Sequence, residues 1–278
     1  MRNLVVICFL FILFSCSNQN QPKDDRLNFN VKIKPEQIYT VTTNNSYSTE
    51  VRYEGKEKAM NKLRSMGVKN PNILSRSNQT MMLLKTEKVL DNYIPVRLEI
   101  VKSTGSDGQA DISQGLVVNG ESTGGNMPEF SSIVSGKSPV IDEKLFLKSL
   151  QGSFSRLNLP EKRLKPGEEF TVESTLTIPM EKSHVEIALS TIYILKSVEG
   201  DVANFEISQN YQMSQLRMDN SFAGVGEGSG RLIYNAANNM VTLFEMKSRL
   251  EINKKLENFL FVLKSNSEFS QNIEMAKK

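Results

Sequence analysis

The chain has 278 residues with 34 basic and 31 acidic side chains, which gives a formal net charge of +3. This balance predicts neither nucleic-acid binding nor strong binding to anionic lipids. One histidine and two cysteines are too few for the usual zinc sites, so we expect neither a metal nor a cofactor. Tryptophan is absent and aromatic residues make up 8% of the chain, which argues against a carbohydrate-binding surface built on stacked rings.

The N-terminus has the pattern of an export signal. Arg2 precedes an unbroken apolar run, Leu4–Phe14, which is too short for a membrane-spanning helix of about 20 residues. The tetrapeptide Leu13-Phe14-Ser15-Cys16 resembles the bacterial lipobox. This resemblance implies that a peptidase removes residues 1–15 and that Cys16 carries diacylglycerol on its sulfur and an acyl chain on its new amine. An ordinary secretory peptide with a chance cysteine is the alternative.

Residues 16–26 are polar, include Pro22 and are expected to form a flexible linker between the anchor and the body. Within this linker, Lys23-Asp24-Asp25 resembles the acidic signal that sends lipoproteins of Bacteroidota to the outer leaflet. A solvated run of linker charges explains these residues equally well. We therefore expect a lipid-anchored protein of the cell envelope, at the outer membrane, on either its periplasmic or its surface-exposed side.

The body, residues 27–270, is predicted to be rich in β-strands. Apolar and polar residues alternate over 170–180, 185–195 and 203–213, which is typical of antiparallel strands with one buried and one wet face. Turn residues separate these runs. Further strands are expected at 80–89, 94–100, 116–121, 240–252 and 256–264.

Two segments have helical spacing instead. Residues 54–66 carry apolar side chains on one helical face and end before Gly67, a plausible C-cap. Residues 142–157 carry another apolar stripe behind Asp142, a natural N-cap. The stretch 119–139, rich in Gly, Ser and Pro, is predicted to be a loop. The expected fold is mainly β, a large twisted antiparallel sheet with two covering helices.

The sequence contains a candidate internal repeat. Residues 33–41 align without gaps on residues 164–172, with identical Lys, Pro, Thr and Val, and place Tyr39 opposite Phe170. Farther on, 84–86 loosely parallels 189–191. Two similar β units, residues 27–141 and 157–264, would explain these matches. The alternative is that turns leading into strands look alike.

The second half also resembles a family. The motifs Leu159-Pro160, Leu164–Phe170, Tyr193–Leu195 and Gly200–Ala203, together with a Gly-x-Gly-x-Gly strand, resemble uncharacterised lipoproteins of Bacteroidota that share a domain of unknown function. The resemblance covers roughly residues 27–264. It implies an envelope location and lends no activity.

The glycine-rich segment is the most informative feature of the body. Gly224, Gly226, Gly228 and Gly230 alternate with other residues, so in a strand they share one face. No Gly-Lys-Ser/Thr follows, which excludes a phosphate-binding loop. A strand face without side chains is expected to be closely covered, either by packed protein, a helix or aromatic side chains, or by an apolar ligand that uses it as a floor.

Catalytic residues are not evident. His184 is the only histidine and is predicted to lie at a hairpin turn. Asp107 and Asp111 lack the spacing of a calcium loop. We therefore expect a non-enzymatic envelope lipoprotein with a binding or structural role, whose partners are the membrane, through its anchor, and a protein or apolar ligand. The alternatives are a carrier of lipid or another apolar ligand in a cavity between sheet and helix, and a hydrolase that uses carboxylates.

Overall fold

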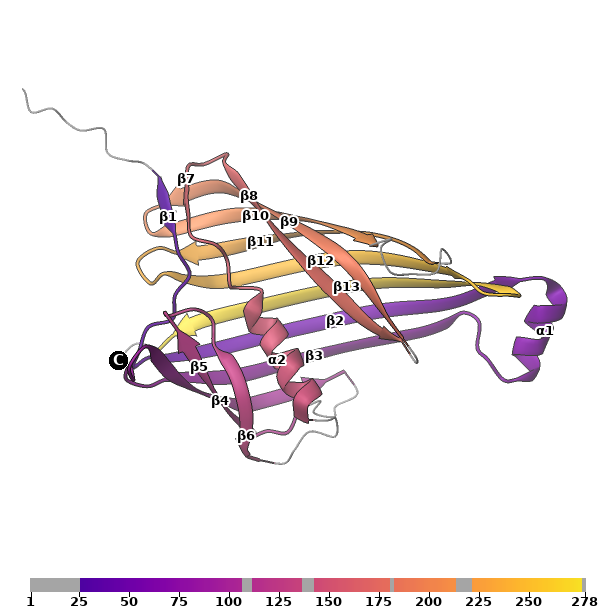
Figure 1. Ribbon diagram of the computed structural model, residues 1–278, viewed down its shortest axis with the longest axis horizontal. Coiled ribbons are helices and arrows are strands. Elements are labelled where there is room, and N and C mark those ends of the chain that lie inside the picture. The colour runs from indigo at the N-terminus through magenta and orange to yellow at the C-terminus, as the bar shows by residue number, and fades with distance from the viewer. Residues whose placement is uncertain (1–25, 107–111, 137–142, 181–182, 214–221, 277–278) are drawn as a thin grey trace, which may run out of the picture.

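The computed structural model describes residues 26–276 except 107–111, 137–142, 181–182 and 214–221. In these residues the main sheet has eleven antiparallel strands in the order β6-β5-β4-β3-β2-β13-β12-β11-β10-β9-β8 (Figure 1). The prediction of a mainly β fold with a large antiparallel sheet is confirmed.

The elements have the following bounds. The main sheet contains β2 (Ile38–Gly55), β3 (Asn72–Thr86), β4 (Tyr93–Gly105), β5 (Val117–Thr123), β6 (Glu129–Ser135), β8 (Glu169–Met180), β9 (Ser183–Glu199), β10 (Val202–Met213), β11 (Phe222–Asn235), β12 (Met240–Lys255) and β13 (Phe259–Met275). A second sheet pairs β1 (Leu27–Phe29) with β7 (Lys162–Leu164), and the helices are α1 (Glu57–Ser65) and α2 (Glu143–Ser155).

The main sheet consists of two meanders that meet at its centre. Strands β2 to β6 follow one another outward on one side, and strands β8 to β13 follow one another inward on the other. The junction is the long antiparallel ladder between β2 and β13, which runs from Tyr39–Met275 to Gly55–Phe259. The first and last strands of the main sheet therefore hold the two meanders together.

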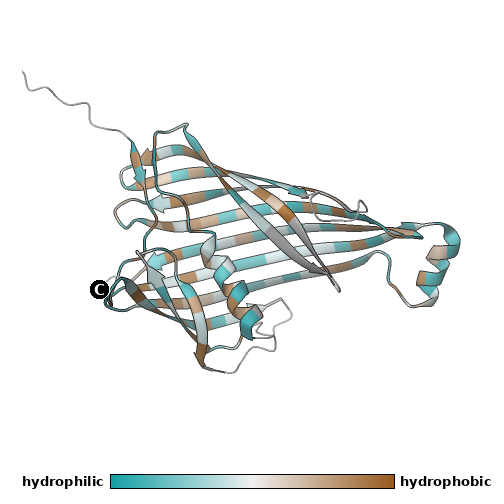
Figure 2. Cartoon of the chain, in the orientation of Figure 1, coloured by the Kyte–Doolittle hydropathy of each residue, from teal (hydrophilic) through white to brown (hydrophobic). Residues whose placement is uncertain are grey.

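One face of the sheet, here called the inner face, carries the hydrophobic core. Side chains alternate along each strand, so apolar and polar residues alternate in Figure 2. Helix α2 lies on the inner face between the two curled edges of the sheet (Figure 1). It buries its apolar stripe there, which confirms the predicted helix; the stripe comprises Phe146, Leu150, Phe154 and Leu157. Asp142, the predicted N-cap, lies outside the described residues.

Helix α2 also closes the open edge of the sheet at β6. The Gln151 side chain accepts a hydrogen bond from the Phe130 N–H at 3.0 Å and donates one to the Pro128 carbonyl at 3.0 Å. The Glu143 carboxylate accepts a hydrogen bond from the Ile133 N–H at 3.3 Å. Because an unpaired edge strand invites pairing with another chain, these side chains protect the edge. Strand β6 lies inside the stretch 119–139, so the prediction of a loop there was wrong.

Helix α1 has a different position from the one expected. It connects β2 to β3 at the far end of the sheet and none of its residues is buried, so it does not cover the sheet (Figure 1). Gly67 ends it in the left-handed region, at φ +75°, with its N–H bonded to the Arg64 carbonyl and the Val68 N–H bonded to the Leu63 carbonyl. This is the C-terminal motif that the glycine predicted. We call this end, residues 54–69 and 254–260, the distal tip.

The two aligned turns have similar geometry. Glu36 and Gly167, which occupy the same position in the alignment, both have positive φ, +56° and +92°. Tyr39 pairs with Leu84 across the sheet, while Phe170 pairs with Tyr193. The equivalent of Leu84 is thus Tyr193, so the loose parallel with residues 189–191 was wrong by four positions. A duplication of the two β units stays a prediction.

The chain enters the fold through the residues that follow the linker, here called the strap, residues 27–34. Phe29 is fully buried, with ring centroids 4.8 Å from Tyr234, 5.0 Å from Phe205 and 5.7 Å from Phe170. The Asn30 backbone N–H donates to the Tyr234 hydroxyl at 3.2 Å.

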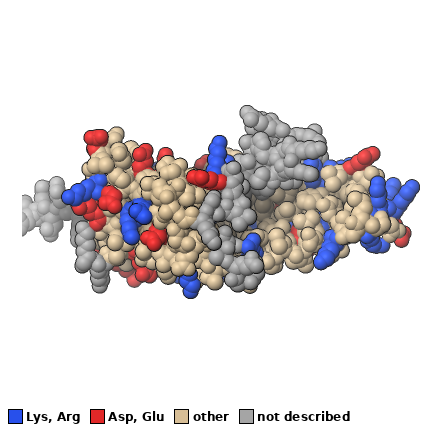
Figure 3. Space-filling model, turned by 90° about the horizontal axis from the view of Figure 1, so that it is seen from below, with Lys and Arg blue, Asp and Glu red and all other residues tan. Residues whose placement is uncertain are grey.

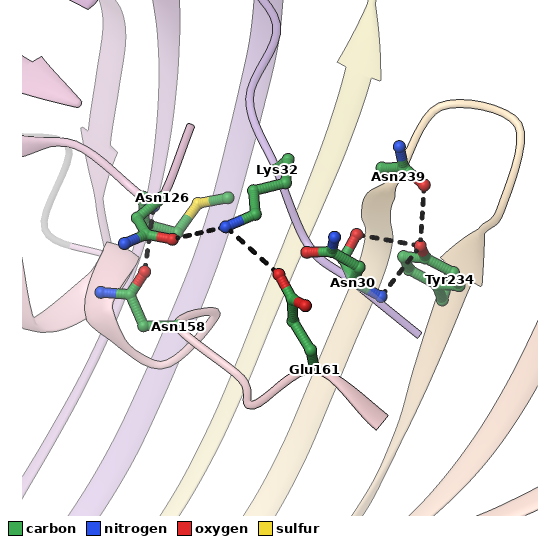
Figure 4. A network of polar contacts seen from close by, with 8 residues as sticks. Asn30, Lys32, Asn126, Asn158, Glu161, Tyr234 and Asn239 are labelled. Carbon is green, nitrogen blue, oxygen red and sulfur yellow. Dashed lines mark hydrogen bonds and ion pairs between the residues drawn. The ribbon is translucent and has the colours of Figure 1, made fainter. Parts of the chain in front are cut away.

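Polar contacts continue this attachment along the strap (Figure 4). The Lys32 ammonium lies 3.1 Å from the Asn126 amide oxygen and 3.5 Å from the Glu161 carboxylate. The Lys32 N–H donates to the Asn239 carbonyl at 2.8 Å. The strap is therefore built into the core at the end of the sheet opposite the distal tip, here called the proximal end.

Replacing Phe29 by Ala should destabilise the whole body. Truncating a buried Phe typically costs about 3–5 kcal/mol, which for a domain of this size lowers the melting temperature by roughly 10 °C. Thermal unfolding followed by circular dichroism measures the effect. Asn28→Ala, a change at an exposed position of the same strand, is the control. Equal melting temperatures for the two variants would show that the strap is not part of the cooperative unit.

Candidate functional site on the inner face

The predicted glycine face lies in β11 on the inner side of the sheet. Gly226 pairs with Tyr211 of β10 and Leu250 of β12, and Gly230 pairs with Ile207 and Met246. The four glycines Gly224, Gly226, Gly228 and Gly230 thus form a strip without side chains between rows of larger residues.

The neighbouring strands approach this strip closely. A Cβ atom on Gly226 would lie 2.7 Å from the Arg249 carbonyl oxygen and 3.2 Å from the Tyr211 Cβ. A Cβ atom on Gly230 would overlap the carbonyl oxygen of Glu245. Separations this short are not found between real Cβ atoms and backbone, so glycine is required where β11 and β12 approach each other. The atoms nearest to the missing side chains thus belong to neighbouring strands and not to a helix.

Arg156, which directly follows α2, lies over the inner face next to this strip. Its guanidinium carbon is 4.5 Å from the centroid of the Phe269 ring, a cation–π contact. Burial lowers the pKa of the Arg156 guanidinium, and the nearby phenols of Tyr211 and Tyr193 partly oppose this shift. Yet the residue as a whole is exposed. Protein atoms thus lie around the guanidinium, although water still reaches the Arg156 side chain.

Polar side chains line the same part of the inner face. The Tyr211 hydroxyl donates to the Gln209 amide oxygen at 2.8 Å, and the Gln209 amide donates to the Thr191 hydroxyl at 3.0 Å. Burial raises the pKa of Tyr193 to about 12, so this phenol stays neutral at physiological pH. Gln271 is only 1% exposed, and among the described residues its side-chain amide has no hydrogen-bond partner.

Together, these residues form what we call the Arg156 site. It combines one guanidinium, two phenols and an amide with aromatic rings and a smooth glycine strip; its members are Arg156, Tyr193, Gln209, Tyr211, Phe269 and the four glycines. An anion can bind to the guanidinium while an apolar chain lies on the rings. The site therefore offers chemistry for binding an amphiphilic ligand.

The opposite, outer face is polar. Three grooves of about 540, 1060 and 400 Å³ cross it. Their side chains bond to one another: the Gln79 amide donates to the Asn44 oxygen at 2.8 Å, and the Asn44 amide donates to the Ser270 hydroxyl at 3.1 Å. The Lys247 ammonium lies 2.9 Å from the Glu268 carboxylate. Much of this hydrogen-bonding capacity is therefore already used within the protein.

The other residues singled out from the sequence are spread apart or lie outside the described part. His184 is in β9, opposite Pro179 and close to the β8–β9 turn. Cys16, Asp107 and Asp111 lie outside the described residues. The described residues contain no cluster of His, Cys, Asp or Glu that could hold a metal ion. Neither helix in this part of the chain is long and apolar enough to cross a membrane.

Arg156 was not singled out from the sequence. The available signal was its position between Phe154 and Leu157, two residues of the predicted apolar stripe. A charged residue next to an apolar stripe can either face solvent or lie over the sheet, and the spacing of apolar residues does not show which of the two holds for Arg156.

Comparison with known families finds no family model that matches the chain, and no curated protein matches it. Among solved structures, the chain is similar to an outer membrane channel from Pseudomonas putida F1. The two share 6% sequence identity over 88% of this chain and 98% of the channel, with a TM-score of 0.21. A likeness at this TM-score carries no argument about function.

Adding a methyl group to the glycine strip should destabilise the sheet in a graded way. Gly230→Ala and Gly226→Ala force the added Cβ against backbone oxygens and should cost about 1–3 kcal/mol each, as overpacking does. Gly228→Ala should cost less, because the nearest atom is the movable methyl end of Met246, at 2.8 Å.

Melting temperatures measure this order, with Ser229→Ala on the exposed outer side of the same strand as the control. A raised melting temperature for Gly230→Ala would contradict the close approach of β12.

Proposed function

We propose that this protein is a non-catalytic lipoprotein of the cell envelope, attached to the outer membrane by acyl chains on Cys16. In this proposal the β-sheet body has a binding or structural role outside the bilayer. The proposal combines the lipobox-like tetrapeptide with the resemblance to lipoproteins of Bacteroidota.

The observation that carries the proposal is the fixed attachment of the strap. A body held by its N-terminus needs a firm attachment where the tether meets the fold, and Phe29 is fully buried only three residues after the linker. The hydrogen bonds of Asn30 and Lys32 add to this attachment. Because the strap is packed into the core, an anchor on the N-terminus would hold the whole β-sheet body and not only a loose segment.

The linker limits how far the body can lie from the bilayer. Residues 16–26 span at most about 40 Å when fully extended, because a chain gains roughly 3.3–3.6 Å for each residue. The strap lies at the proximal end of the sheet, so this end faces the anchoring membrane and the long axis of the sheet leads away from it (Figure 1).

Cys16→Ala should abolish incorporation of labelled palmitate and should move the protein from the membrane fraction to the soluble fraction. The reason is that no other thiol is positioned to receive the diacylglycerol. Cys8→Ala removes the second cysteine of the chain within the export signal and is the matched control, which should keep the label. Palmitate labelling that persists in Cys16→Ala would refute the anchor.

The Arg156 site favours a second candidate, a carrier of lipid or another apolar ligand. Its guanidinium would bind the anionic end of an amphiphile, while Phe269 and the glycine strip would contact the apolar part. Arg156 follows α2, and the phenols that influence its pKa belong to β9 and β10, so a ligand on the guanidinium would lie near both the helix and these strands. The carboxylate-based hydrolase stays a prediction.

The carrier can be tested by titrating the purified full chain with a fluorescent fatty acid. Arg156→Gln should weaken binding about tenfold, because it removes the charge that pairs with the carboxylate. Lys148→Gln removes an exposed charge from α2 and should leave binding unchanged. No binding by the parent chain, or equal affinities for both variants, would refute the carrier.

A further inference from the structure

The distal tip exposes apolar side chains. A groove of about 930 Å³ separates α1 from the turn between β12 and β13. Met66 is 67% exposed and Leu260 is 37% exposed. The apolar residues along the groove are Ala59, Leu63, Met66, Leu256, Phe259 and Leu260. Apolar side chains grouped in this way on a surface mark an interaction site.

Basic residues surround this groove. The distal tip, residues 54–69 and 254–260, contains seven basic and three acidic residues, a net charge of +4. The whole chain carries +3, so everything outside the tip sums to −1. In Figure 3, Lys and Arg side chains gather at this end of the molecule. The overall charge therefore hides a local concentration of positive charge, and the expectation of weak binding to anionic lipids does not extend to the tip.

The kind of basic residue distinguishes between partners. Six of the seven cations at the tip are lysines and only Arg64 is an arginine. Protein interfaces are enriched in arginine and depleted in lysine. Lysine side chains instead extend along apolar surface and place their ammonium groups among lipid headgroups. Lys56, Lys58, Lys62 and Lys255 are among the residues that line the apolar groove.

We propose that the distal tip binds the surface of an anionic phospholipid bilayer, with α1 lying in the headgroup region. The apolar side chains of the groove enter the boundary of the acyl chains, and the lysines pair with lipid phosphates. No residue of α1 is buried in the protein, so this helix can enter the interface without exposing the core.

The tip lies far enough from the proximal end to meet a second membrane. Strand β2 runs from the proximal end to the tip, and its 18 residues span about 60 Å. If the N-terminus is anchored as proposed above, the tip faces away from the anchoring bilayer. The protein then bridges two surfaces. This bridging rests on the proposed anchor, whereas the affinity of the tip for anionic lipid does not.

The test uses the full chain in phosphatidylcholine vesicles, mixed with protein-free vesicles of phosphatidylcholine alone or with phosphatidylglycerol added. Light scattering measures clustering, which we expect only with phosphatidylglycerol and which high salt should reduce. Lys58→Glu/Lys62→Glu should lower clustering about tenfold or more. Lys88→Glu/Lys162→Glu makes the same charge change at exposed positions away from the tip and should leave clustering unchanged.

A second variant, Leu63→Ser, tests the apolar contribution, and melting temperatures confirm that the variants are folded. Incorporation into the first vesicles is measured separately by flotation. If incorporation fails, the anchor is refuted, and direct flotation of the chain with phosphatidylglycerol vesicles still tests the tip. Equal binding by the parent and Lys58→Glu/Lys62→Glu, or binding to an acidic protein without binding to anionic vesicles, would overturn the proposal.

Discussion

The fold depends on burying the apolar part of the inner face of the main sheet. The larger apolar cluster of the inner face lies near the proximal end, where Tyr39 and Val41 of β2 are buried, whereas Asn45, Tyr47 and Thr49 farther along the same strand are only partly covered. Removing the apolar half from water is the main driving force available to such a sheet. The chain therefore places α2, the strap and the small sheet over that half. Farther along the inner face, a smaller buried cluster joins Ile187, Tyr211 and Ile252, with Leu189, Leu250 and Leu263 packed against it.

Much of the fold follows from the sequence because alternation gives the sheet directly. The runs 170–180 and 203–213 became β8 and β10, and the stripe from Phe146 to Leu157 became α2. The full length of β2 could not be predicted from the sequence. Residues 44–49 carry mainly hydroxyl and amide side chains on both faces of the strand, so apolar and polar residues do not alternate there. The position of α1 could not be predicted either, because an apolar stripe indicates a helix but does not indicate the surface against which that helix packs.

The candidate sites illustrate a second limit. The glycine strip was visible from its spacing alone, yet the atoms that approach it come from β12, and a sequence does not state which strands are neighbours. The Arg156 site joins Arg156, which follows α2, to residues of β9, β10, β11 and β13, and only the three-dimensional arrangement brings these together. The charge of the distal tip likewise comes from two segments far apart in the chain, so the net charge of +3 concealed it.

The ladder between β2 and β13 has a consequence for the order in which the chain acquires its structure during synthesis. β2 is synthesised early, whereas β13 follows roughly two hundred residues later and is the last strand among the described residues. Until then β2 presents an unpaired edge about 60 Å long, which other chains can join. Only a chain that includes β13 can join its two meanders, so a chain that stops before β13 remains open to aggregation through that exposed edge.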